Sequence, residues 1–231
     1  SEGTAQLLKA RMLGDREWQA HGFNAPFDLD PGIRGELFPA GHIPGSSMLR
    51  LEGDQSSLLY TGDFKLDSGP AAESCVVPRA DTLIMETTYG IPKYTFPPLS
   101  EVATEMIQFC RESIEDGVIP VLFGYSLGKA QVILSILRQS ELDIMLHPQA
   151  LKMTQACQAI GFNYPDFQPF DVNRVAGHVV ISPPLASKSK WLNQIPNRRT
   201  ATVSGWAVDP SIKYRSGTDK AFPVSDHSDF L

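Results

Sequence analysis

The chain has 231 residues, of which 42% are hydrophobic and 20% are charged, and its formal net charge is −6. This length suffices for one large or two small cores, and the negative charge argues against indiscriminate nucleic-acid binding, which depends on neutralising phosphates. No apolar run is long enough for a signal peptide or a membrane span, and the three cysteines lack zinc-finger spacing. These properties predict a cytoplasmic protein with reduced thiols and no membrane partner.

The first ninety or so residues predict a sheet-rich region. A helix is expected over residues 4–13, and short apolar segments separated by glycine and proline predict strands after it. Residues 48–52 and 57–60 flank a turn-forming sequence and predict a hairpin. The apolar run 81–86 predicts a buried strand.

A change of pattern follows residues 91–98, where three prolines in eight residues predict a linker. Beyond it, apolar strand segments alternate with helical segments. The strands are expected near residues 118–123, 144–146, 179–181 and 201–203. The helices are expected near residues 100–115, 128–139, 149–160 and 187–192. Such alternation predicts a parallel, doubly wound sheet, so the fold class is α/β.

A histidine and an aspartate flank the predicted hairpin. His42 lies in Ala-Gly-His-Ile-Pro-Gly-Ser, and Asp63 lies in Tyr-Thr-Gly-Asp-Phe. Because an antiparallel hairpin brings its open ends together, these side chains should meet at one sheet edge, where an imidazole and a carboxylate suit zinc or manganese. The alternative is that His42 is an ordinary loop residue and that Asp63 caps a turn.

Further motifs follow in a fixed order. They are residues 82–90 (Thr-Leu-Ile-Met-Glu-Thr-Thr-Tyr-Gly), 123–131 (Phe-Gly-Tyr-Ser-Leu-Gly-Lys-Ala-Gln), 204–206 (Ser-Gly-Trp) and 224–229 (Val-Ser-Asp-His-Ser-Asp). With the His42 and Asp63 motifs they resemble the β-CASP branch of the metallo-β-lactamase fold. The nearest match is the bacterial ligase-associated DNA exonuclease, or mRNA 3′-end processing-like, subfamily. The resemblance implies a partial metallo-β-lactamase αββα sandwich at residues 1–91 and 205–231, interrupted by a Rossmann-like β-CASP insert at 92–204.

The resemblance also implies roles for the site residues. Two divalent ions, zinc or manganese, would be bound with His42 as a ligand of one and Asp63 bridging both. His227 would be the general acid that protonates the leaving oxygen, and Glu86 would orient it rather than bind metal. Without the resemblance, Glu86 could equally cap the turn that follows it, and His227 could simply begin a helix.

The sequence Gly-Tyr-Ser-Leu-Gly at residues 124–128 supports two interpretations. It follows an apolar strand and precedes a helix, as the nucleophile elbow of α/β-hydrolases does, and Ser126, Asp209 and His227 occur in the required order. This alternative, a serine esterase, leaves His42, Asp63 and Glu86 unexplained. In a nuclease, the same helix start would hold a substrate phosphate. The predicted substrate-binding residues are Ser126, Gly128, Lys129 and Ser182.

One departure from the resembled family concerns its main ligand motif, His-x-His-x-Asp-His, which this sequence does not contain. We therefore expect the chain to be a fragment of a longer protein and to be inactive alone. The parent is expected to be a metal-dependent nuclease acting on DNA or RNA ends, in the manner of a 3′ exonuclease, with a DNA ligase or helicase as a partner. A third alternative is a non-catalytic nucleic-acid-binding or scaffold module.

Overall fold

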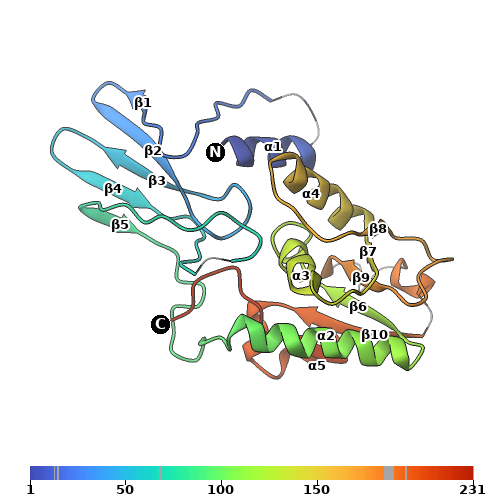
Figure 1. Ribbon diagram of the computed structural model, residues 1–231. Coiled ribbons are helices and arrows are strands. Elements are labelled where there is room, and N and C mark those ends of the chain that lie inside the picture. Colours follow the sequence, from blue (N-terminus) through green and yellow to red (C-terminus); the bar gives the residue numbers. More distant parts are fainter. Residues whose placement is uncertain (13, 15, 68, 185–189, 196, 231) are drawn as a thin grey trace. The chain divides into compact units, whose positions relative to one another are not determined.

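The computed structural model describes residues 1–12, 14, 16–67, 69–184, 190–195 and 197–230 (Figure 1). The described chain divides into two compact units, each of mixed sheet and helix content. The first unit contains residues 1–92 and 226–230, and the second contains residues 93–225. The predicted α/β class is therefore confirmed. No helix in the described ranges is both long and apolar enough to cross a membrane.

The first unit is built on a five-stranded sheet of order β1-β2-β3-β4-β5. The strands are β1 (Phe27–Asp30), β2 (Ile33–Pro39), β3 (Ser47–Glu52), β4 (Ser57–Tyr60) and β5 (Thr82–Ile84). The first four pair antiparallel, and β5 pairs parallel with β4. The hairpin predicted from the sequence is therefore present as β3 and β4.

Helix α1 (Glu2–Arg11) precedes this sheet and is capped by the Ser1 side chain, so it begins two residues before the predicted start at residue 4. Its predicted end at residue 13 lies outside the described residues. A small cluster of buried residues forms part of the core of this unit. Its members are Ala40, Met48, Leu59 and Phe64.

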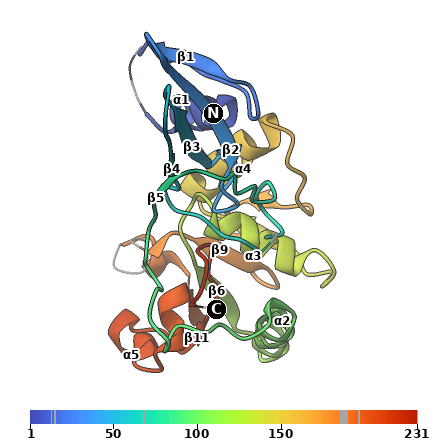
Figure 2. The same cartoon turned by 90° about the vertical axis from the view of Figure 1, so that its left-hand side faces the viewer.

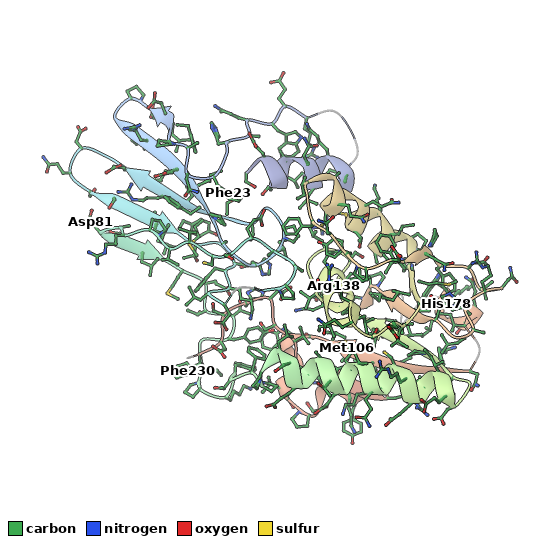
Figure 3. The ribbon with its side chains drawn as sticks, viewed as in Figure 1. Phe23, Asp81, Met106, Arg138, His178 and Phe230 are labelled. Atoms are coloured by element: carbon green, nitrogen blue, oxygen red, sulfur yellow. The ribbon has the colours of Figure 1, made fainter. Side chains whose placement is uncertain are left out.

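The prediction that residues 81–86 form a buried strand was wrong about the burial. All three residues of β5 are exposed, and Leu83 has 55% of its surface accessible. The reason is position, since β5 lies at the end of the sheet order and, among the described residues, pairs with β4 alone. Asp81 accepts hydrogen bonds from the Ser57 amide and hydroxyl, which fixes the start of β5 against β4 (Figure 3).

The second unit contains a six-stranded sheet in which every described pairing is parallel. The strand order is β11-β10-β6-β9-β7-β8. The strands are β6 (Ile119–Phe123), β7 (Ile144–Leu146), β8 (Gln168–Pro169), β9 (Val179–Ser182), β10 (Arg198–Val203) and β11 (Lys220–Phe222). The parallel sheet expected from the strand–helix alternation is confirmed.

Helices cover both faces of this sheet. They are α2 (Leu99–Glu115), α3 (Lys129–Leu137), α4 (Pro148–Ala159) and α5 (Ile212–Ser216), with short 3₁₀ turns η2 (Leu192–Gln194) and η3 (Gly205–Val208). Helix α2 packs on β6, α3 on β9, and α4 on β7 and β9, whereas α5 packs on β10 and β11. Figure 2 shows α2 and α5 on opposite sides of the sheet. Of the helix predicted at 187–192, residues 187–189 lie outside the described part.

The second unit extends further along the chain than the predicted insert. Strand β11 follows residue 205, where a return to the core was expected, but it pairs with β10 in the second sheet. The physical reason is that Phe222 is fully buried and its strand continues the parallel sheet. The change of unit therefore falls between Ser225 and Asp226.

Candidate functional site

The loop from β2 to β3 holds His42 in a tight turn. The Ser46 hydroxyl accepts hydrogen bonds from the amides of His42 and Ile43, at 3.1 and 3.3 Å. Gly41 has φ +75°, and a Cβ there would lie 2.3 Å from the Lys65 carbonyl oxygen. Because only glycine allows both this conformation and this approach, the loop of His42 lies directly against the loop that follows Asp63.

The orientation of His42 is set by a backbone carbonyl. Its Nδ1 lies 2.9 Å from the carbonyl oxygen of Asp226, an atom that can only accept, so Nδ1 carries the proton. The other ring nitrogen, Nε2, lies 3.8 Å from Oδ2 of Asp63. That distance is too long for a hydrogen bond, but it is close to the roughly 3.4 Å that separates two ligand atoms on a tetrahedral zinc ion. The donor pair therefore fits a divalent cation.

Glu86 and His227 form a second pair, at 2.7 Å between Oε1 and Nδ1. Both side chains are largely buried, with 13% and 16% of their surfaces exposed. Glu86 also accepts hydrogen bonds from the amides of Phe64 and Thr88. Burial alone would raise the pKa of Glu86, but the hydrogen bonds from Thr88, Phe64 and His227 together outweigh it and lower the pKa below its ordinary value. Glu86 is therefore a carboxylate that holds the imidazole.

The two pairs lie together in the first unit. The rings of His42 and His227 are 4.5 Å apart between centroids, and Tyr89 packs edge-on to His227 at 5.8 Å. Potential ligand atoms of Asp63, Glu86 and His227 all lie within 4.8 Å of one another. The four side chains singled out in the sequence therefore meet at one place.

Sequence reasoning missed the hydrogen bonds that connect these pairs. The Ser228 amide donates to the Phe64 carbonyl, and the Ser228 hydroxyl accepts from the Leu66 amide, each at 2.9 Å. Residues 226–228 thus hold the loop that begins at Asp63 on one side and His42 on the other. The only sequence signal was the polar character of the Ser-Asp-His-Ser-Asp run, because backbone partners leave no residue signature.

No family model matches the chain, but several known proteins are similar to it. Over its full length the chain is 47% identical to a probable DNA ligase of Opitutus terrae, of which it spans 23%. It is 29% identical over 178 residues to the transcription termination factor FttA of Methanocaldococcus jannaschii, covering 74% of this chain and 28% of that protein. It is 26% identical over 240 residues to the 5′ exonuclease Apollo of Rattus norvegicus, covering 98% of this chain and 42% of that protein. These relatives support the β-CASP metallo-β-lactamase family that the sequence motifs resemble.

The chain spans less than half the length of these three relatives. Its fold also matches a solved structure, a protein of unknown function from Enterococcus faecalis V583. That match has a TM-score of 0.58 at 14% identity and covers 98% of this chain and 64% of the other. The match extends over both units, so the fold of each is shared with a solved protein.

The predicted substrate-binding residues lie in the second unit. The Gly128 amide donates to Gln131 Oε1, and the buried Lys129 ammonium donates to the Val224 carbonyl at 2.8 Å. Ser126 is half-buried in the turn that precedes α3. Ser182 is fully buried at the end of β9, and its hydroxyl has no hydrogen-bond partner among the described residues. Contact of these four residues with substrate stays a prediction.

The serine-hydrolase interpretation requires a pair of Asp209 and His227, but each of these residues is hydrogen-bonded to other residues. Nδ1 of His227, the atom that a triad aspartate would hold, is bonded to Glu86. The Asp209 carboxylate accepts hydrogen bonds from the Ser211 amide and from Arg215. These partners of His227 and Asp209 are therefore other residues than a serine-hydrolase triad would need.

Proposed function

We propose that this chain is part of a cytoplasmic, metal-dependent phosphodiesterase that hydrolyses DNA or RNA ends. In this proposal the first unit is a partial metallo-β-lactamase αββα sandwich, and the second unit is its Rossmann-like β-CASP insert. The observation that carries the proposal is the meeting of His42 with Asp63 and of Glu86 with His227 in one unit. Relatives named as an exonuclease and as an RNase support it.

The donor chemistry fits zinc or manganese. His42 offers Nε2 with its proton held on Nδ1, and Asp63 offers a carboxylate whose side chain is 57% exposed. Bound divalent ions at such a site supply a water of lowered pKa and stabilise charge on the scissile phosphate. The relatives are longer than this chain, and we propose that other segments of the whole protein complete a two-ion site, so that the chain alone has little activity.

The acid–base part of the mechanism is carried by this chain's own residues. Glu86 accepts a hydrogen bond from Nδ1 of His227, which fixes the orientation of the ring. His227 then donates a proton from Nε2 to the leaving oxygen of the nucleic-acid chain. Protonation of a leaving alkoxide in this way contributes typically about 10²–10⁴-fold to a rate.

The direction of cleavage and the partner protein are to be decided by experiment, because the names of the relatives differ. The subfamily resemblance favours a 3′ exonuclease, whereas the rat relative is named a 5′ exonuclease. A DNA ligase, joined to the nuclease or bound to it, fits the name of the Opitutus protein, and a helicase is the other candidate partner.

The test uses the whole parent protein with manganese and oligonucleotides labelled separately at each end. Asp63→Asn should lower the cleavage rate by at least about 100-fold and reduce the metal content measured by elemental analysis. Asp67→Asn, an exposed aspartate close by on the same loop, should leave both unchanged. The proposal would be overturned in favour of a serine hydrolase if Ser126→Ala abolished hydrolysis while Asp63→Asn remained active.

A further inference from the structure

Two exposed aromatic side chains follow neighbouring strands of the second sheet. Tyr125 comes two residues after β6 ends and has 67% of its surface exposed, and Trp206 comes three residues after β10 ends and is 45% exposed. Strands β6 and β10 are parallel and in register, with Phe123 opposite Thr202. Tyr125 and Trp206 therefore lie at the same edge of the sheet, outside the carboxyl ends of adjacent strands.

This edge is a topological switch point. From β6 the chain passes through α3 to β7, on one side in the strand order, whereas from β10 it passes through η3 and α5 to β11 on the other side. The two connections leave in opposite directions from adjacent strands. Open α/β sheets bind their ligands in this position.

The Trp206 ring is held in place before any ligand arrives. Tyr94, of which only 9% is exposed, packs edge-on against it with ring centroids 5.5 Å apart and an interplanar angle of 86°. The Trp206 amide donates to the Ser204 hydroxyl, and its carbonyl accepts from the Asp209 amide. A large aromatic side chain that is fixed yet half exposed loses little entropy when a flat ligand stacks on it.

Charge near Trp206 suits an anionic strand. The Asp209 carboxylate is paired with Arg215 at 3.2 Å, and Arg215 keeps 63% of its side chain exposed. Lys213, on the same short helix, lies over the ring of Tyr214. A phosphate backbone that passes this edge therefore meets the exposed Arg215 and a carboxylate that is already paired.

We propose that Tyr125 and Trp206 form a stacking platform for the bases of single-stranded nucleic acid. The choice of nucleic acid as the ligand rests on the proposed function. Stacking on aromatic faces accepts any base, because every base has a π-face, and it needs bases that are not already stacked in a duplex. The platform thus selects single-stranded ends and tolerates any sequence.

The test measures binding without hydrolysis. A fluorescently labelled ten-nucleotide thymidine strand is titrated with the protein in excess chelator, and affinity is read from anisotropy. Trp206→Ala should weaken binding by about 5- to 100-fold, and Trp206→Phe should retain most of the affinity because it keeps an aromatic face. Trp18→Ala is the matched control, since Trp18 is comparably exposed at 36% but lies in the first unit.

Two results would overturn the inference. One is equal affinity of Trp206→Ala and Trp18→Ala for the single strand in proteins whose circular dichroism matches the unmutated protein. The other is an equal loss of affinity for single-stranded and blunt duplex DNA, which would indicate general phosphate binding. The parent protein could instead bind the single strand through Trp206 but show no metal-dependent cleavage. That result would support the platform and contradict the proposed nuclease function.

Discussion

Replacing Glu86 with Gln tests the network around the candidate acid. Glu86 accepts hydrogen bonds from the Phe64 amide at 3.0 Å, the Thr88 amide at 3.2 Å and His227 at 2.7 Å. In glutamine, an NH₂ group replaces one of the two carboxylate oxygens of Glu86. That NH₂ group cannot accept a hydrogen bond, so at least one of the three donors loses its acceptor. Hydrogen bonds to a charged, largely buried group contribute about 1.5–3 kcal/mol, so we expect a loss of about 2–3 kcal/mol in the free energy of unfolding.

The measurement is urea unfolding of four proteins: unmutated, Glu86→Gln, His227→Gln and the double variant. Because Glu86 and His227 contact each other, their effects should couple by about 1 kcal/mol or more. Additivity within about 0.5 kcal/mol would refute the argument that Glu86 acts on His227 directly. The result does not depend on metal or substrate, so it tests the geometry by itself.

The same pair gives a pH dependence with a defined sign. The pKa of Glu86 is lowered in the folded protein, so the unfolded chain binds its proton first as the pH falls. The contribution of Glu86 to the free energy of unfolding is therefore complete above the unfolded pKa of about 4.3. It is lost as the pH falls through the lower pKa of the folded protein. The stability difference between the unmutated protein and Glu86→Gln should shrink below about pH 4. A difference that grows in acid would contradict the assignment.

Three further changes test other parts of the structure. Ser228→Ala should cost about 1 kcal/mol in urea unfolding by removing the acceptor of the Leu66 amide, and Ser228→Thr should restore it. Gly41→Ala should destabilise the protein by more than about 3 kcal/mol, because its Cβ would meet the Lys65 carbonyl at φ +75°, and a melting temperature within 2 °C of normal would argue against it. Nδ1 of His147 caps α4, and burial lowers the pKa of this histidine. The melting temperature should therefore fall as the pH drops below about 6.5, where the unfolded chain binds the proton more readily. His147→Asn should abolish that dependence.

Much of the candidate site could be predicted because strand pairing fixes where chain ends lie. The hairpin of β3 and β4 brings the loops of His42 and Asp63 to one sheet edge, as its antiparallel register requires. Glu86 joins them because β5 runs parallel to β4, with Ile84 opposite Tyr60. For His42 and Asp63 the local hairpin pattern was enough, whereas the role of Glu86 came from the family resemblance.

Other features could not be predicted because they depend on partners that sequence patterns do not specify. The apolar run at β5 gives no sign that the strand ends the sheet and stays exposed, since burial is decided by what packs against it. The Asp226 carbonyl that orients His42 is a backbone atom, which any residue would supply. Likewise, the second unit continues past residue 205 because of the pairing of β11, a strand of only three residues.

The return of the chain at residue 226 explains how a site can span a long interruption. After residues 93–225 form the second unit, three successive residues bind three different partners: Asp226 holds His42, His227 holds Glu86, and Ser228 holds the segment from Phe64 to Leu66. The entropy cost of closing a loop grows only with the logarithm of its length, by about 0.6 kcal/mol for each doubling. A few hydrogen bonds of about 1 kcal/mol each therefore offset large differences in insert length. The geometry of the site should accordingly tolerate changes in the size of the second unit far better than changes in these three residues.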